Sequence, residues 1–218
     1  SGDIHSSFSS LRNQLAAGLN MGLAGIPWWT TDIGGFHGGD PKDPKFQELL
    51  VRWFEYGTFC PVMRLHGYRW PLQPQYGTTG GATCVSGAPN EVWSYTDQVC
   101  EILSDYLRLR ERMLPYITEL MEEAHEKGTP VMRPLFYDFP EDKESWNVET
   151  EYMFGPKVLV KPITDADARE TDVYLPGGAS WTNAWTGETF EGGQKVHVAA
   201  PIEQIPLFTR DGYKLPMK

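Results

Sequence analysis

Side chains that can transfer protons or bind hydroxyl groups occur at three places in this sequence, each of them expected at the end of a strand. Asp3 is the first, Asp32 and Phe36 flank a Gly-Gly pair at the second, and Arg64 and His66 form the third. Two carboxylates beside a glycosidic bond can divide the work of cleaving it, because one protonates the leaving oxygen while the other attacks or activates water. The pattern therefore predicts a sugar-cleaving site with Asp3 as one of its carboxylates.

Each of these residues also has a purely structural interpretation. An Asp beside Gly is commonly a turn or cap residue, and His66 before Gly67 can be an ordinary loop residue. Arg64 can form a structural ion pair or orient a carboxylate, and Phe36 can belong to the core. Their occurrence at successive strand ends favours the functional interpretation, because enzymes with a (β/α)8 barrel gather their catalytic groups at the carboxyl ends of the strands.

Residues 1–128 alternate between helical and strand-like segments. Ser6 or Ser7 can cap a first helix, Asp43-Pro44 begins a second, and Gly128 ends a long third helix that Pro115 should kink. Short buried strands are expected at 23–29 and 60–64, and a long glycine-rich loop at 65–89. Such units match the closing part of a (β/α)8 barrel, of which eight would need roughly 250 residues. Only about two and a half units are present, so the barrel is expected to be incomplete.

Residues 129–218 have a different pattern and are predicted to form a second domain, an antiparallel β-sandwich. Short β-prone segments alternate there with turn sequences such as Pro-Gly-Gly and Glu-Gly-Gly. The predicted strands are 131–139, 152–154, 157–162, 171–175, 179–185, 195–198 and 205–208. The fold class predicted for the whole chain is therefore α/β plus all-β, with the domain boundary near residue 128.

Composition excludes several classes of function. The net charge of -10 argues against a nucleic-acid partner, and no apolar run approaches the roughly 20 residues of a membrane span. Cys60, Cys84 and Cys100 lack the spacing of a zinc site and are expected to be free thiols, which favours a reducing, cytoplasmic compartment. The five histidines have no metal-site spacing either, so neither a metal nor a cofactor is expected.

Several motifs, taken in order along the chain, resemble glycoside hydrolase family 31. In the first domain they are Ser1-Gly2-Asp3, Ile26-Pro27-Trp28-Trp29-Thr30-Thr31-Asp32-Ile33-Gly34-Gly35-Phe36, Pro61-Val62-Met63-Arg64-Leu65-His66-Gly67 and Leu109-Arg110-Glu111-Arg112-Met113-Leu114-Pro115-Tyr116. The segments Tyr152-Met153-Phe154-Gly155, Trp185-Thr186-Gly187-Glu188 and Ile205-Pro206-Leu207-Phe208 resemble the sandwich domain that follows the barrel in that family. The resemblance covers nearly the whole chain.

The resemblance implies a retaining α-glycosidase, either an α-xylosidase or an α-glucosidase, that acts on oligosaccharides without a cofactor. It assigns Asp3 as the general acid/base, while His66 contacts the sugar and Phe36 lines the subsite that holds it. Asp32 either binds the sugar there or holds a neighbouring Arg, and Arg64 supports the site without contacting the sugar. The Trp-Trp-Thr-Thr-Asp form of the second motif favours the α-xylosidase branch.

The sequence departs from the family in one important respect. The family's nucleophilic Asp lies upstream, within a Trp–x–Asp–(Met/Phe)–x–Glu type of motif, and no such motif occurs in these 218 residues. We therefore expect the chain to be a fragment that is inactive alone, with the missing N-terminal part of the same enzyme as its partner. The alternatives are a family 31 transglycosylase and, from another class, a non-catalytic piece that binds carbohydrate or assists assembly.

Overall fold

The computed structural model of the chain describes residues 2–217, and its first two helices begin at caps that the sequence predicts. Ser7 precedes α1 (Phe8–Leu23), and its side chain accepts a hydrogen bond from the N–H of Ser10. Asp43 precedes α2 (Pro44–Thr58), and its side chain accepts from the N–H of Lys45. Each helix therefore starts where a short polar side chain binds an N–H group that the first helical turn leaves free.

The predicted long third helix is in fact two helices, α3 (Asp97–Arg112) and α4 (Leu114–Lys127), which meet at Met113. Pro115 has no N–H and cannot donate a hydrogen bond to the carbonyl of Glu111 one turn earlier. The chain therefore breaks the helix where only a kink was expected. Gly128 ends α4 as predicted, in a left-handed conformation with φ of 70°.

The two strands predicted at 23–29 and 60–64 are wrong as strands. Both segments run without regular pairing. Val62 N donates to Trp29 O at 3.0 Å, and the next bond, from Ile33 N to Arg64 O at 3.3 Å, already lies beyond the first segment. A strand needs a repeated ladder of such bonds. Burial alternates only at the end of the first segment, where Trp29 is buried and Trp28 is 60% exposed, because residues 23–26 are all exposed.

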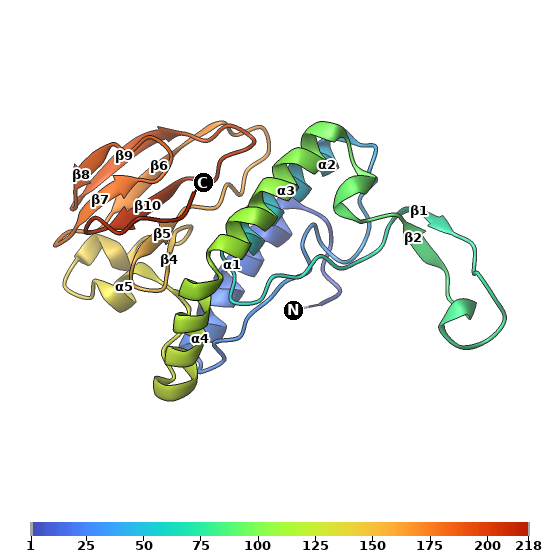
Figure 1. Cartoon of the computed structure of the whole chain (residues 1–218), viewed down its shortest axis with the longest axis horizontal. Helices are drawn as coiled ribbons and strands as arrows, with labels where there is room; N and C mark the ends of the chain where they lie inside the picture. The colour runs from blue at the N-terminus through green and yellow to red at the C-terminus, as the bar shows by residue number, and fades with distance from the viewer. Residues whose placement is uncertain (1, 218) are drawn as a thin grey trace.

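The long loop predicted at 65–89 forms most of an arm that projects from the body of the molecule (Figure 1). Its base is an antiparallel pair of strands, β1 (Arg69–Gln73) and β2 (Ser86–Ala88), and its tip holds the short 3-10 helix η1 (Gly80–Thr83). A second 3-10 helix, η2 (Val92–Ser94), connects the arm to α3.

The C-terminal part is built on antiparallel sheets, as predicted. Six strands pair in the order β3-β4-β5-β10-β7-β8, and β6 and β9 form a separate two-stranded sheet. The bounds are β3 (Met132–Arg133), β4 (Tyr152–Phe154), β5 (Val158–Val160), β6 (Glu170–Leu175), β7 (Ser180–Asn183), β8 (Thr189–Glu191), β9 (Gln194–Ala199) and β10 (Leu207–Arg210).

One strand prediction in this part is wrong and one strand was missed. The segment 131–139 is a strand only at β3, because Pro134 is followed by the short helix α5 (Leu135–Asp138). β8 was not predicted, since its three residues lie between two turns and none is buried. The 3-10 helix η3 (Lys143–Trp146) completes the elements of this part.

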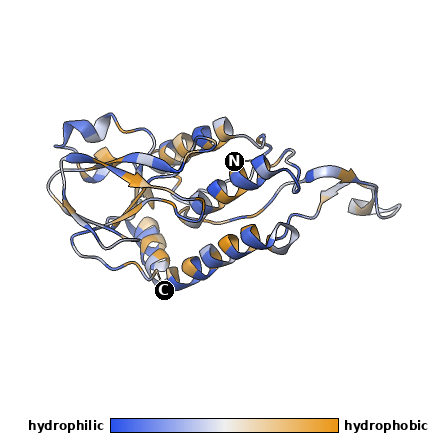
Figure 2. Cartoon of the chain, turned by 90° about the horizontal axis from the view of Figure 1, so that it is seen from above, coloured by the Kyte–Doolittle hydropathy of each residue, from blue (hydrophilic) through white to orange (hydrophobic). Residues whose placement is uncertain are grey.

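The helices and the C-terminal sheet share one hydrophobic core. The ring of Phe59 after α2 packs edge-to-face on Phe154 of β4 at 6.0 Å, and Tyr152 donates a hydrogen bond to the Phe59 carbonyl at 2.9 Å. Seen from above, the helices carry hydrophobic and hydrophilic stripes, as amphipathic helices on a shared core do (Figure 2). Within residues 2–217, no helix combines the length and apolar character needed to cross a bilayer.

Candidate active site

Three segments that are far apart in the sequence run in parallel and bring the predicted site residues together. These segments are residues 3–6, 35–37 and 66–68, and the edge that they form is called the rim. His5 bridges to His37, and His37 bridges to Tyr68, both in parallel register. Phe36 donates its N–H to the Ile4 carbonyl at 2.8 Å, and Tyr68 donates its N–H to the Phe36 carbonyl at 3.0 Å. The segments that carry Asp3, Phe36 and His66 are therefore neighbours, in the order in which barrel strands follow one another.

Two glycines allow this close approach. A Cβ atom on Gly35 would lie 2.7 Å from Ser6 Cα, and one on Gly67 would lie 2.7 Å from the Gly35 carbonyl oxygen. Both residues also have positive φ, of 83° and 122°, which glycine adopts at little cost. Any larger side chain at either position would push the segments apart, so these glycines set the spacing of the rim.

Asp3 lies on this rim with its side chain exposed, in a left-handed backbone conformation with φ of 57°. The residue that follows, Ile4, accepts hydrogen bonds from the N–H groups of Phe36 and His37 at 2.8 and 2.9 Å. The Asp3 carboxylate is thus held one residue away from an anchored backbone position and remains open to a ligand.

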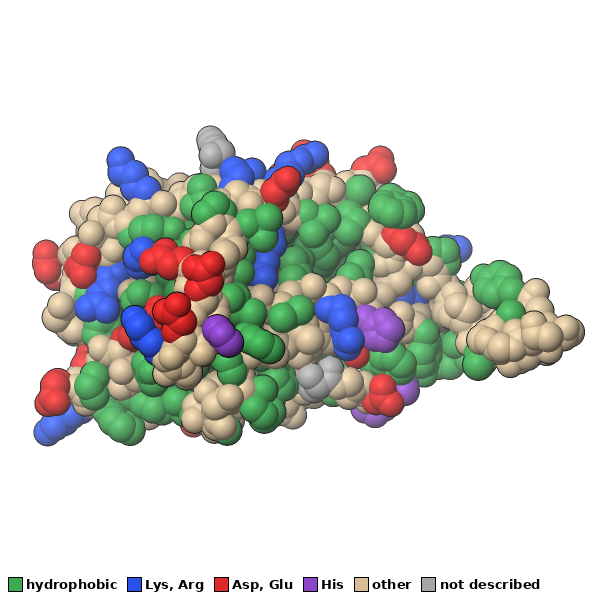
Figure 3. All heavy atoms as spheres, turned by 60° about the horizontal axis from the view of Figure 1, so that its bottom comes forward, with side chains coloured by type: hydrophobic (Ala, Val, Ile, Leu, Met, Phe, Trp, Pro, Cys, Tyr) green, Lys and Arg blue, Asp and Glu red, His purple; other side chains and the backbone are tan. Residues whose placement is uncertain are grey.

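Phe36 and His66 form an aromatic pair on the same rim, with ring centroids 5.4 Å apart. Phe36 is half-buried and also packs on His37 and Tyr68, whereas His66 is exposed. Histidine side chains on this face lie beside hydrophobic side chains near the base of the arm (Figure 3). The pair offers an apolar wall and one polar ring edge to whatever occupies the rim.

Asp32 and Arg64 form an ion pair through Oδ1 and Nη2. The Asp32 side chain is 1% exposed and that of Arg64 is 47% exposed, so the buried carboxylate is covered by a guanidinium that reaches water. This ion pair is compatible with the second of the two roles expected for Asp32, that of holding a neighbouring Arg. Its second oxygen, Oδ2, is buried and has no hydrogen-bond partner among the described residues.

The sequence did not point to Arg69, whose side chain holds the loop of residues 33–38 in place. Its fully buried guanidinium donates hydrogen bonds to the carbonyls of Ile33, Gly35 and Gly38 at 2.9–3.0 Å. Burial lowers the pKa of Arg69, and Tyr95 and Asp32 nearby oppose that shift. The only available signal was an arginine inside an otherwise aromatic run, Tyr68-Arg69-Trp70.

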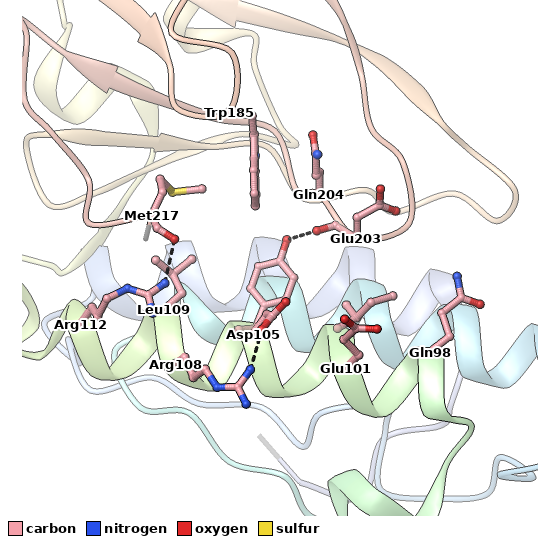
Figure 4. Close-up of a pocket in the computed structure, with 12 residues that line it drawn as sticks. Gln98, Glu101, Asp105, Arg108, Leu109, Arg112, Trp185, Glu203, Gln204 and Met217 are labelled. Carbon is pink, nitrogen blue, oxygen red and sulfur yellow. Dashed lines mark hydrogen bonds and ion pairs between the residues drawn. The ribbon is translucent and has the colours of Figure 1, made fainter.

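A cavity of about 630 Å³ lies away from this rim, between α3 and the loops of the C-terminal part (Figure 4). Trp185 reaches into it from the sheet side, and Arg112 on α3 donates a hydrogen bond to the Met217 carbonyl at 2.8 Å. None of the five predicted site residues lines it. The predicted residues therefore gather at an open rim and do not line this cavity.

The rim can supply one carboxylate in contact with solvent, one aromatic wall and one buried carboxylate–guanidinium pair. A carboxylate beside an apolar wall can exchange a proton with an oxygen that is held against the wall. Among residues 2–217, no three His, Cys, Asp or Glu side chains gather as metal ligands.

Comparison with protein families gives two matches that follow one another along the chain. The family 31 glycosyl hydrolase TIM-barrel domain matches residues 1–120, and the family 31 glycosyl hydrolase C-terminal domain matches residues 128–215. These matches confirm the predicted fold class, part of a barrel followed by an antiparallel sheet domain.

Individual relatives point in the same direction. An α-xylosidase of Saccharolobus solfataricus is 39% identical over 217 residues, which are 100% of this chain and 27% of that protein. α-Glucosidase 2 of Bacillus thermoamyloliquefaciens is 35% identical over 97% of this chain and 24% of its own length. The crystal structure of an α-xylosidase from a soil metagenome, complexed with xylose, is 53% identical with a TM-score of 0.94, over 98% of this chain and 32% of that one. The chain spans about a quarter to a third of these relatives, and it belongs to glycoside hydrolase family 31.

Proposed function

We propose that this chain carries the general acid/base and one wall of the sugar subsite of a retaining α-glycosidase. The substrate would be an oligosaccharide with a terminal α-linked xylose or glucose. The observation that supports the proposal is the parallel arrangement of three neighbouring segments, of which one carries Asp3 and the other two carry the Phe36–His66 pair. The similarity to an α-xylosidase that was crystallised with xylose supports it.

In the first step, Asp3 donates its proton to the glycosidic oxygen as the bond to the anomeric carbon breaks and a carboxylate nucleophile bonds to that carbon. In the second step, the Asp3 carboxylate removes a proton from water, whose oxygen displaces the nucleophile and releases the sugar. Phe36 and His66 would hold the sugar ring, and the Asp32–Arg64 pair would keep the loop that carries Phe36 in place.

The nucleophile would come from sequence other than these 218 residues. Two facts support this part of the proposal: the chain covers only 27–32% of two of its α-xylosidase relatives, and it lacks the family's nucleophile motif. In a retaining site the two carboxyl groups stand about 5 Å apart, so the missing segment would pack directly on the rim of Asp3. A cytoplasmic location stays a prediction from the free cysteines.

Xylose is the better candidate for the sugar. The solved α-xylosidase is 53% identical to this chain, whereas the α-glucosidase is 35% identical. Both activities follow the same two steps, so the choice between them changes the sugar that is released and not the role of Asp3.

The first prediction concerns activity with and without the rest of the barrel. The isolated chain should not hydrolyse aryl α-xyloside or aryl α-glucoside, because Asp3 has no partner carboxylate. A chimera in which this chain replaces the aligned third of the soil-metagenome α-xylosidase should hydrolyse the α-xyloside. Release of the aryl group measures both. Turnover by the isolated chain that Asp3→Asn abolishes would show that the chain is an enzyme by itself and contradict the proposal.

A further inference from the structure

A cleft of about 620 Å³ opens at the base of the arm, and two tryptophans stand in its walls. Trp70 lies in β1 and is 47% exposed, while Trp93 lies in η2 and is 76% exposed. Large aromatic side chains left in water around one hollow are characteristic of binding surfaces. The volume is within the range of roughly 300–1,000 Å³ that is usual for small-molecule sites.

Buried hydrogen bonds hold both walls of this cleft in place. Arg69 donates to the Gly38 carbonyl at 3.0 Å on one side and to Asn90 Oδ1 at 3.0 Å on the other. Trp70 donates its own N–H to the Gly39 carbonyl at 2.9 Å. Asn90, before η2, is thereby fixed relative to Gly38 and Gly39 in the loop before α2. The cleft is therefore formed before any ligand binds.

The cleft continues from the candidate active site through touching aromatic rings. Phe36 packs edge-to-face on Tyr68 at 5.8 Å, and Tyr68 packs edge-to-face on Trp70 at 6.1 Å. The same loop, residues 33–40, carries Phe36 and borders the cleft at Asp40. A chain of sugar units that leaves the Phe36–His66 pair in this direction would meet the tryptophans next.

Polar groups surround the apolar walls. Glu91 accepts a hydrogen bond from the Ser94 hydroxyl at 2.8 Å, and Asp40 Oδ1 accepts one from the Lys42 N–H at 2.8 Å. Carboxylate oxygens held in this way can still accept hydrogen bonds from hydroxyl groups. Indole faces with polar groups at the edge suit a neutral sugar ring, which has apolar C–H faces and a polar rim. Two carboxylates and one ammonium, that of Lys42, line the cleft, so its charge does not favour an anionic ligand.

We propose that the cleft between Trp70 and Trp93 binds a sugar unit on the leaving-group side of the bond that is cleaved. The natural substrate is then an oligosaccharide whose remainder stays bound at the arm, and not a sugar with a small leaving group. The direction in which the oligosaccharide runs from the cleaved bond to the tryptophans rests on the function proposed for Asp3. The binding of carbohydrate at the tryptophans does not, and it is measured separately.

The test is a titration of the full 218-residue chain with cellotetraose and maltotetraose, and with xylose for comparison. Calorimetry and tryptophan fluorescence measure the binding. At least one tetrasaccharide should bind saturably. Trp93→Ala should weaken that binding about tenfold, because a sugar face loses the apolar surface that covers it. Trp93→Phe should keep most of the affinity, and Trp93→Ala should leave the thermal midpoint nearly unchanged because Trp93 is mostly exposed.

Trp146 provides a matched control. It is also exposed, at 58%, but it lies in η3 of the C-terminal part, where it stacks on Phe136 at 4.5 Å. Trp146→Ala should bind the tetrasaccharide as the parent does. Binding is measured without turnover, which separates this result from the catalytic role proposed for Asp3. The proposal is overturned if neither tetrasaccharide binds saturably, or if Trp93→Ala binds as tightly as the parent.

Discussion

At the scale of single residues, the rim combines an exposed carboxylate with a buried one, and the two have different surroundings. The Asp3 side chain is exposed to solvent. A group that exchanges protons with substrate and water needs such exposure. Asp32 is buried against Arg64, and within residues 2–217 one of its oxygens has no hydrogen-bond partner. These surroundings fit the separate tasks proposed for them, proton transfer for Asp3 and positioning of the Phe36 loop for Asp32.

This division predicts an asymmetry between the members of the ion pair. Arg64→Met should reduce the free energy of unfolding by about 1–3 kcal/mol, because it removes the guanidinium that pairs with the buried Asp32 carboxylate, on which only the charge of Arg69 nearby still acts. Asp32→Asn should cost less, since the half-exposed Arg64 can turn to water. Denaturant unfolding measures both.

The control is Arg108→Met, which removes the guanidinium from an exposed pair with Asp105 and should change stability by about 0.5 kcal/mol or less. Equal costs for Asp32→Asn and Arg64→Met, or a larger cost for Asp32→Asn, would show that the buried carboxylate does not depend on Arg64.

At the scale of elements, α2 connects the barrel part to the C-terminal part through polar side chains inside the core. Arg52 donates hydrogen bonds to the carbonyls of Ala200 and Ala168 at 2.6 and 3.0 Å and pairs with Glu55 at 3.1 Å. Tyr106 of α3 donates to Glu55 at 3.1 Å and accepts from the N–H of Ile205 at 3.1 Å. These bonds fix α2 to the C-terminal part.

Glu55 makes the stability of this connection depend on pH. Burial raises the pKa of Glu55 from its ordinary 4.5 to about 8, although Arg52 and Tyr106 oppose the shift. The unfolded chain loses this proton near pH 4.5 while the folded chain keeps it, so the contribution to stability is full below about pH 4.5 and is lost as the pH rises toward 8. The decline is at most about 1.4 kcal/mol per pH unit.

Glu55→Gln should remove this part of the pH dependence, because the amide has the same shape and does not titrate. Denaturant unfolding at pH 5 and pH 7.5 should show that the variant gains on the parent by about 1 kcal/mol or more as the pH rises. Glu101→Gln on the exposed face of α3 serves as the control and should follow the parent. Parallel pH curves for Glu55→Gln and the parent would contradict a raised pKa in the folded state.

At the scale of the whole molecule, local chemistry made some features predictable and long-range packing decided others. Caps and breakers act within a few residues, so Asp43 and Gly128 marked helix ends correctly. The segments 23–29 and 60–64 read as strands, but a strand forms only where a neighbour completes its hydrogen bonds, and these two meet at single points.

The candidate site shows the same division. That the segments of Asp3, Phe36 and His66 lie side by side could be predicted, because glycines and aromatic residues mark the loops that carry them. Arg69 and Arg52 could not be predicted. Their partners are mainly backbone carbonyls from distant segments, and a carbonyl leaves no trace in the sequence.

The central claim is that Asp3 transfers protons to and from the glycosidic oxygen and water. The direct measurement is made on Asp3→Ala in the active chimera, with an aryl α-xyloside and with α-xylosyl fluoride, whose leaving group needs no proton from an acid. Hydrolysis of the aryl xyloside should fall by about 10²–10⁴-fold, and the fluoride should still react in the first step. Azide should restore turnover by replacing activated water and should yield an α-xylosyl azide.

Asp105→Ala, which removes an exposed carboxylate from α3, should behave as the parent chimera in every one of these assays. If Asp3→Ala instead lost activity equally on both substrates and azide restored none, Asp3 would not be the acid/base, and the account of this chain would be wrong at its centre.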